Sequence, residues 1–315
     1  MSRLRIGTHG SALELAQAQL VAGRLAADRH EDAEIVTVTT SGDRGAGGGD
    51  KSRWVDTIED ALLAGEIDLA VHSAKDLPGE LAAGLTLLGA PARAAVEDVL
   101  CGATDLLALA PGVRVGTSSI RRAAQLRAAR EDLDVVALGG NVDTRLRLLA
   151  QGSFDAIVLA RAGLQRLERE QEVGAVLDPA RFVPAPGQGA LALEARADDV
   201  RVREAVAAIL DADTSACLLA ERAFASALDA TCHTPLGANA TPAGCGCLGL
   251  RAWVGLPDGS AWVADELLGG HYDPTALGRR MAERMTAAGA RELLTEAGRH
   301  APFGANLPFR PARRR

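Results

Sequence analysis

The chain has 315 residues, of which 48% are hydrophobic, so it can form two or three domains that each have a core. Its formal net charge of −7 at pH 7 argues against general binding of nucleic acid, and no apolar stretch approaches the roughly 18 residues of a membrane span. Because the N-terminus shows no signal-peptide pattern and the five cysteines form no even disulfide framework, we expect a cytoplasmic protein without membrane partners.

The first half of the sequence alternates short apolar segments with amphipathic ones, which is typical of an α/β sheet with helical crossovers. Strands are predicted at 4–7, 34–39 and 67–72. Helices are predicted at 54–64 and from Ser11 to about residue 27, where Ser-Ala-Leu-Glu forms a capping box. The polar, glycine-rich stretch 41–53 predicts a mobile loop.

A second alternating unit begins near Asp98. Its strands are predicted at 113–115, 135–138 and 156–159, each followed by a helix. The proline- and glycine-rich run 183–189 then predicts a crossing back to the first unit, where 191–195 forms one more strand.

The pattern changes after residue 212. A helix is predicted at 213–228, a hairpin at 247–254 and 261–267, and a helix from about 273 to 298. The predicted fold is therefore two α/β domains, formed by 1–89 with 190–208 and by 95–183, followed by a small α+β domain at 212–315.

Three predicted strand–helix junctions carry small polar residues, at Thr8 to Ser11, Gly116 to Arg122 and Gly139 to Arg145. The unpaired N–H groups of a first helical turn and the helix dipole favour an anion, and arginines add charge-assisted hydrogen bonds. Ordinary helix capping is the alternative for each junction. Together they favour a ligand with several carboxylates or phosphates, although none has the spacing of a nucleotide-binding loop.

Only two of the 34 basic residues are lysines, Lys51 and Lys75. In a chain that otherwise uses arginine, a retained compact ammonium suggests a chemical role, although leftover surface lysines are the alternative. Asp76 follows Lys75 at the end of a predicted strand, where open α/β sheets place their ligands. It can serve as a fixed negative charge facing a developing cation, or simply as a turn residue before Pro78.

The cysteines permit several readings. Cys232, His233, Cys245 and Cys247 could form a zinc site, but no second ligand pair follows at zinc-finger spacing, so we expect no metal. Cys245-x-Cys247 at strand spacing predicts two thiols on one face of a sheet, packed as small hydrophobic residues. On residue type alone, Cys232 is expected to be a buried loop thiol.

Taken together, the segments resemble the porphobilinogen deaminase (hydroxymethylbilane synthase) family over essentially the whole chain. The matching blocks are His72 to Pro78, Gly116 to Arg122, Gly140 to Leu146, Asp155 to Leu167, Gly187 to Ala190 and Ala230 to Gly237. The resemblance implies two α/β domains around a cleft, like those of periplasmic binding proteins, plus a small C-terminal domain. It also implies a monomer whose small-molecule substrate is porphobilinogen.

The resemblance further implies that the enzyme condenses four porphobilinogens head to tail, with release of ammonia, on a covalent dipyrromethane cofactor. The implied anchor is Cys232, and the other four cysteines are left as packing residues. The implied catalytic residues are Asp76 and Lys75. The implied cofactor-binding residues are Lys51, Ser11, Thr117, Ser118, Ser119, Arg121, Arg122, Asn141, Arg145 and Gln188. The implied substrate-binding residues are His9, Gln17, Arg121 and Arg145.

The sequence also departs from the family pattern. His9 and Gly139 stand where the family has arginines, Glu97 replaces a positive charge, Thr57 replaces an acidic residue and the glycine-rich lid is shorter. Each lost charge-assisted contact is worth roughly 1.5–3 kcal/mol. Two alternatives therefore stay open: a pyrrole- or tetrapyrrole-binding protein without full activity, and a related enzyme that makes a different chain length or uses a different pyrrole.

Overall fold

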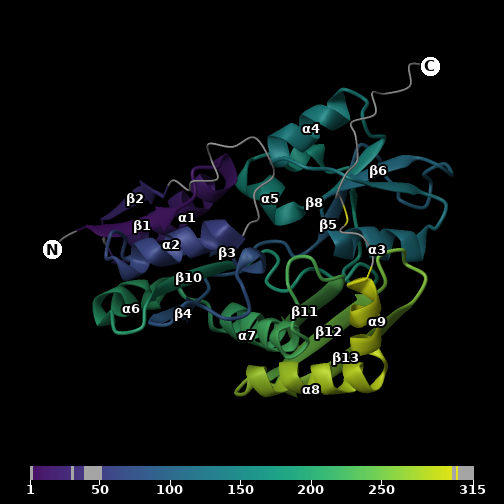
Figure 1. Ribbon diagram of the computed structural model, residues 1–315. Coiled ribbons are helices and arrows are strands. Elements are labelled where there is room, and N and C mark those ends of the chain that lie inside the picture. Colours follow the sequence, from purple (N-terminus) through teal and green to yellow (C-terminus); the bar gives the residue numbers. More distant parts are fainter. Residues whose placement is uncertain (1–2, 30–31, 39–51, 300–302, 304–315) are drawn as a thin grey trace.

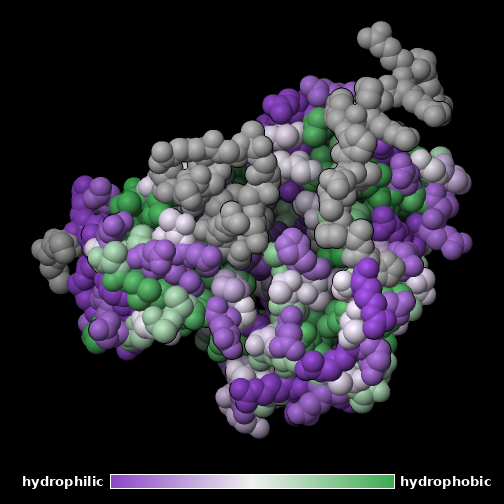
Figure 2. Space-filling model, in the orientation of Figure 1, coloured by the Kyte–Doolittle hydropathy of each residue, from purple (hydrophilic) through white to green (hydrophobic). Residues whose placement is uncertain are grey.

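The computed structural model describes residues 3–29, 32–38, 52–299 and 303, which form three β-sheets and the helices that cover them (Figure 1). Polar and charged side chains cover much of the face shown in Figure 2, with smaller apolar areas between them. None of the helices within the described residues is long and apolar enough to cross a membrane.

The first sheet lies on the left of Figure 1. Its strand order is β2 (Ala33–Thr37), β1 (Leu4–Thr8), β3 (Leu69–Ser73), β10 (Leu191–Arg196) and β4 (Leu85–Gly89). β1 is parallel to both β2 and β3, whereas β10 is antiparallel to β3 and β4. The accompanying helices are α1 (Ala12–Arg29), α2 (Ser52–Leu63), α6 (Val200–Val206) and the short turns η2 (Ala74–Asp76) and η4 (Ala207–Ile209).

The second sheet has the same arrangement of parallel and antiparallel strands. Its order is β7 (Asp134–Ala137), β6 (Arg114–Thr117), β8 (Ala156–Ala160), β5 (Asp98–Cys101) and β9 (Ala175–Val176). β6 is parallel to β7 and β8, and β5 is antiparallel to β8 and β9. Helices α3 (Ile120–Ala129), α4 (Val142–Ala150) and α5 (Arg161–Arg166) follow β6, β7 and β8, and η3 (Glu170–Glu172) precedes β9.

The third sheet is an antiparallel meander of β11 (Leu236–Pro242), β12 (Cys247–Gly255) and β13 (Trp262–Gly270). Alternate residues of β12, such as Leu250, form a core with Phe224 of α7 (Ala212–Ala227) and Met281 of α8 (Pro274–Ala287). The helix α9 (Ala290–Ala297) completes this core through Ala290. The helices therefore cover one face of the sheet, as period-two burial requires.

Two crossing segments, 90–97 and 177–190, join the first sheet to the second. They are hydrogen-bonded to each other, because Ala94 N–H donates to the carbonyl of Gly189 at 3.1 Å. Gly187 has a φ of 74° and lies so close to Ala74 that a Cβ would not fit without a shift. The predicted crossing at 183–189 is confirmed.

A buried carboxylate holds the third unit against both crossings. Glu221 of α7 accepts hydrogen bonds from Arg93 of the first crossing and from Gly187 N–H of the second, the latter at 2.6 Å. It also accepts from Ala240 N–H in β11 at 2.7 Å. Since Glu221 is fully buried, these bonds fix where the third sheet sits.

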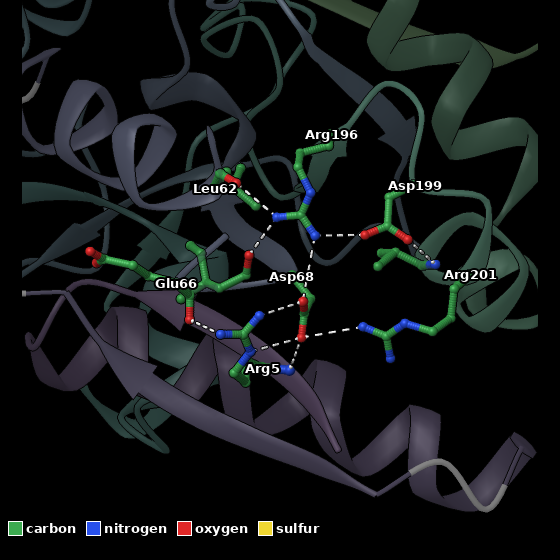
Figure 3. A network of polar contacts seen from close by, with 9 residues as sticks. Arg5, Leu62, Glu66, Asp68, Arg196, Asp199 and Arg201 are labelled. Carbon is green, nitrogen blue, oxygen red and sulfur yellow. Dashed lines mark hydrogen bonds and ion pairs between the residues drawn. The ribbon is translucent and has the colours of Figure 1, made fainter. Parts of the chain in front are cut away.

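A second polar network lies at the amino ends of β1 and β3 in the first sheet (Figure 3). Asp68, just before β3, pairs with Arg5, Arg196 and Arg201 at 2.8, 3.5 and 3.4 Å. Burial alone would raise the pKa of Asp68, but hydrogen bonds from the Arg5 side chain and backbone and the nearby positive charges lower it to about 2. Asp68 is therefore ionised at neutral pH.

The predicted class, two α/β units plus a small α+β unit, is confirmed by the three sheets, whereas the exact domain limits stay predictions. Half of the predicted capping box is present, because Ser11 Oγ accepts from Glu14 N–H at 3.4 Å before α1 begins, whereas the Ser11 N–H donates to His9 Nδ1 at 3.3 Å. The single helix predicted at 273–298 is wrong, because Gly289 with a φ of 99° separates α8 from α9. The sequence pattern also missed β4, β5, β9, β11 and α6.

Candidate active site

The carboxyl ends of the parallel strands in the first two sheets meet at one place. A hollow of about 20 Å³ is lined by Ser73 and Lys75 from the first unit, by Gly163 and Arg166 from the second, and by Gly189 of a crossing segment. β10 and β5 run antiparallel, so their first residues, Leu191 and Asp98, lie at the same sheet edges as Ser73 and Ala160. The topology therefore gathers both units around Lys75 and Asp76.

Arg145 connects the second unit electrostatically with Asp76. The half-buried Arg145 side chain extends from α4, and its Nε donates to the carbonyl of Gly140 at 2.8 Å. Burial and the charge of Arg122 lower the pKa of Arg145, and the charge of Asp76 opposes both, which leaves the pKa at about 10. Asp76 from the first unit and Arg145 from the second are thus close enough to attract each other.

Arg166 supplies another desolvated cation at the same edge. Its Nη2 donates to the carbonyl of Gly189 at 2.6 Å, which ties α5 to the crossing segment. Burial lowers the pKa of Arg166 to about 10, with a further contribution from the charge of Arg24. Among the described residues, no ion pair joins Arg145 or Arg166 to a carboxylate. Both guanidinium groups are therefore suited to binding an anion.

Arg121 and Arg122 are engaged inside the protein. Both are buried and pair with Asp98, at 2.8 Å from Arg121 Nη2 and 2.7 Å from Arg122 Nη2. Burial would raise the pKa of Asp98, but the two guanidinium groups hold it below its usual range. Gln188 joins this network by donating from Nε2 to Asp98 Oδ1 at 2.8 Å. Contact of Arg121, Arg122 or Gln188 with a bound carboxylate stays a prediction.

The polar residues at the junctions cap their helices. Ser119 Oγ accepts from Arg122 N–H at 3.4 Å, and Asn141 Oδ1 accepts from Thr144 N–H at 2.9 Å. Buried Thr117 accepts from Ser119 N–H, whereas Ser118 is exposed. The capping interpretation is therefore confirmed for Ser119 and Asn141. Binding of an anion by the remaining N–H groups of the same turns stays a prediction.

In the first junction, Thr8 to Ser11, and on the helix that follows it, the side chains expected to bind substrate are held by other residues of the protein. His9 is half-buried, and its Nδ1 accepts from Ser11 N–H at 3.3 Å. Gln17 is fully buried, and its Nε2 donates to Ser73 Oγ at 2.8 Å. Gln17 therefore supports the end of β3 just before Lys75, and its direct contact with a ligand stays a prediction. Lys51 and residues 41–50 of the predicted loop lie outside the described residues, and residues 52 and 53, also predicted as loop, begin α2.

The cysteines differ from expectation. Cys232 is exposed in the loop between α7 and β11, so the buried thiol expected from residue type is wrong. Cys101 and Cys217 are buried packing residues, as predicted, and burial raises the pKa of Cys217 to about 12. Cys245 is exposed and Cys247 only partly buried, because Gly244, Cys245 and Gly246 form a turn with positive φ before β12 begins. Within the described part of the chain, no three His, Cys, Asp or Glu side chains are grouped to hold a metal ion.

Comparison with known proteins agrees with this arrangement. The family model described as "Porphobilinogen deaminase, dipyromethane cofactor binding domain" matches residues 4–204, and "Porphobilinogen deaminase, C-terminal domain" matches 215–287. This chain belongs to the porphobilinogen deaminase family. It is 44% identical to the porphobilinogen deaminase of Deinococcus radiodurans over 305 residues, which cover 93% of this chain and 98% of that protein. It is also 44% identical to the Thermus thermophilus protein of that name over 294 residues, or 92% and 98% of the two chains.

Solved structures give weaker matches. The methionine-binding protein MetQ covers 66% of this chain and 89% of its own at 13% identity, with a TM-score of 0.43. A periplasmic substrate-binding protein from Coxiella burnetii covers 65% and 91% at 17% identity, with a TM-score of 0.42. At such scores the likeness does not bear on the fold, which follows from the sheets themselves.

Arg166 was missed by sequence reasoning, although it lies in the block Asp155 to Leu167 that resembles the family. Its position could have indicated a role in the site, because Arg166 lies on a helix that follows a predicted parallel strand, as Arg122 and Arg145 do. Among the positions that depart from the family pattern, Glu97 lies 3.7 Å from Arg161 in the second unit. Gly139 has open space where a side chain would be, so the structure itself does not demand glycine there.

Proposed function

We propose that this chain is a porphobilinogen deaminase that condenses four porphobilinogens head to tail into hydroxymethylbilane. Each condensation forms one carbon–carbon bond, breaks one carbon–nitrogen bond and releases ammonia. Family membership supports the proposal. The observation that links it to the candidate site is that two desolvated guanidinium groups, those of Arg145 and Arg166, lie at the sheet edge where Lys75 and Asp76 follow β3. A cytoplasmic location and a monomeric state belong to the same proposal.

The described residues fit a dipyrromethane primer. Such a group carries carboxylate side chains, which match the cations of Arg145 and Arg166, and pyrrole N–H donors, which match the carboxylate of Asp76. Cys232 supplies an exposed thiol, as covalent attachment requires. When bound, the primer would supply the free pyrrole carbon from which the product chain grows.

The protein's own residues bind and polarise the substrate. Arg145 and Arg166 hold its carboxylates, since a half-buried guanidinium gains more from a charged partner than an exposed one does. Asp76 accepts pyrrole N–H bonds and stabilises the positive charge that develops as the amine leaves. Lys75 adds a mobile cation next to Asp76 for a further carboxylate. The charge of Asp76 raises the pKa of Arg145 and so helps to keep the guanidinium group ionised.

Two other functions compete with this one. The altered positions His9, Gly139 and Glu97 favour a pyrrole- or tetrapyrrole-binding protein without turnover, because each lacks a cation that the family pattern has there. An enzyme that makes a different chain length is the second alternative. Measuring ammonia release together with product mass separates the three functions, since the binding protein releases none and the altered enzyme yields another mass.

The decisive experiment is the intact mass of the purified protein beside those of Cys232→Ser and Cys245→Ser. We expect the wild type and Cys245→Ser to carry an increment of two deaminated porphobilinogen units, and Cys232→Ser to lack it. Cys245 is the matched control because it is also an exposed thiol in a loop. An unmodified wild type after incubation with porphobilinogen or hydroxymethylbilane would overturn the proposal and support a binding protein.

A further inference from the structure

A larger cavity lies away from the candidate active site, between α3 and the face of the third sheet that α7, α8 and α9 leave uncovered. Its volume is about 420 Å³, within the range of roughly 300–1,000 Å³ that is usual for small-molecule sites. It shares no lining residue with the hollow around Lys75. Any ligand it takes is therefore additional to the substrate bound at Asp76.

The walls of this cavity are aromatic, although aromatic residues make up only 3% of the chain. Phe182, Trp253 and Trp262 line it, and two of the three tryptophans of the sequence are among them. In the pairing of β12 with β13, Trp253 lies opposite Ala264 and Gly255 opposite Trp262, so the two indoles share one sheet face. Trp253 is buried, whereas Trp262 is 53% exposed. This arrangement suits a planar ring.

One residue that lines this cavity carries a buried acceptor without a partner. Gln125 of α3 lines it and is only 3% exposed. Its Nε2 donates to the carbonyl of Val183 at 2.9 Å, which fixes the amide orientation because the Oε1 cannot donate. Gln125 Oε1 has no hydrogen-bond partner within the described residues. Since a buried acceptor without a partner is unfavourable, a ligand with an N–H or O–H donor would satisfy it.

The charged residues that line the cavity are two arginines and two carboxylates, so its lining has no net charge, but three of the four are already paired. Arg251 pairs with Glu266 at 2.6 Å and also donates to the carbonyl of Ala180. The carboxylate of Asp265 pairs with Arg284 at 2.6 Å. Of the charged residues that line the cavity, Arg181 is the one without an ion pair among the described residues, and it is exposed at the entrance. A ligand carboxylate would give it a partner.

We infer that this cavity is a second binding site, which takes a planar aromatic carboxylate with a ring N–H donor. The ring lies between Trp253, Trp262 and Phe182, the N–H donates to Gln125 Oε1 and the carboxylate pairs with Arg181. The site also adjoins the buried network of Arg121 and Asp98, because the Val183 carbonyl that accepts from Gln125 accepts from Arg121 Nη1 at 2.8 Å as well.

The test is calorimetric titration of the full chain with indole-3-acetate, which has the three required features. Two analogues remove one feature each: 1-methylindole-3-acetate lacks the N–H donor, and 3-methylindole lacks the carboxylate. We expect one site for indole-3-acetate and binding that is weaker by about fivefold or more for each analogue, as the loss of a hydrogen bond or a charge pair predicts. Trp262→Ala and Arg181→Gln should each weaken indole-3-acetate binding by a similar factor.

Tyr272→Ala and Arg280→Gln are the matched controls, since both residues are exposed and neither lines the cavity. They should bind indole-3-acetate as the wild type does. Because Trp262 and Arg181 are also exposed, their variants should fold, which thermal unfolding can verify. Absence of binding at millimolar concentration, or equal binding by all variants and analogues, would overturn the inference.

Discussion

Arg93 and Glu221 form a two-point ion pair, with 2.7 Å between Nη1 and Oε1 and 3.0 Å between Nη2 and Oε2. Arg93 belongs to the first crossing segment and Glu221 to α7, so the pair joins segments 128 residues apart. Glu221 is fully buried and also accepts the N–H groups of Gly187 and Ala240. The pair is therefore placed to hold all three units together.

Replacing Arg93 with alanine should lower the free energy of unfolding by about 3–5 kcal/mol, because it leaves the Glu221 carboxylate buried without its counter-charge. Urea denaturation measures this loss. The control is Arg284→Ala, which removes a surface partner of Asp265 and should cost less than about 1 kcal/mol. Equal effects of the two substitutions would show that Glu221 does not depend on Arg93.

Asp68 should make stability depend on pH in the acid range. Its pKa is lowered to about 2 in the folded state from an ordinary value of 3.8, so the unfolded state binds the proton more readily. The stabilisation, about 2 kcal/mol, is thus complete above pH 4 and is lost as the pH falls from 4 towards 2.

The variant that tests this is Asp68→Asn, compared with the wild type by urea denaturation at pH 7 and pH 3. The difference between the two proteins should be large at pH 7 and smaller at pH 3. Asp134→Asn is the control, because Asp134 is exposed and its pair with Arg114 is long, at 3.7 Å. A difference that does not change with pH would contradict the assigned role of Asp68.

Much of this fold could be predicted from local sequence patterns, because helices, strands and turns depend mainly on neighbouring residues. Strand and helix alternation predicted β1, α1, β6, α3 and β10, and the capping box located the start of α1. Some wrong predictions had a local signal against them. The glycines on both sides of Cys245 indicate a turn there, and not the strand that we predicted. The break at Gly289 left a similar sign, since glycine commonly ends a helix.

The candidate site could be predicted only in part, because the local sequence does not show which residues far apart in the chain contact each other. Nothing in the residues near Arg121 and Arg122 shows that Asp98, more than twenty positions earlier, takes up both guanidinium groups. Likewise, a capping residue and an anion-binding residue have the same identity at a helix start. The strand-end and junction patterns singled out Asp76 and Arg145, the resemblance to the family gave them roles, and only the structure shows that the charge of one acts on the other.

Arg145→Leu and Arg166→Leu should each reduce kcat/KM for porphobilinogen by about ten- to a hundredfold, which corresponds to the loss of one charge-assisted hydrogen bond. Each should lower the free energy of unfolding by only about 1 kcal/mol, because the hydrogen bond lost to the carbonyl of Gly140 or Gly189 is offset in part by removal of a charge that burial disfavours. Arg147→Leu on the exposed side of α4 is the matched control and should leave activity unchanged. A loss of activity that always follows a loss of stability would point to a structural role instead.

Asp76→Ala should abolish nearly all formation of hydroxymethylbilane while the protein stays folded, because it removes the carboxylate that stabilises the positive charge formed as the amine leaves. Asp76→Asn keeps the size of the side chain and removes only its charge, so it should be almost as inactive if charge is what matters. The measurement is the initial rate of ammonia release, with unfolding temperature as the check on folding. Normal turnover by the asparagine variant would show that Asp76 acts through hydrogen bonding alone, and normal turnover by the alanine variant would remove it from the mechanism.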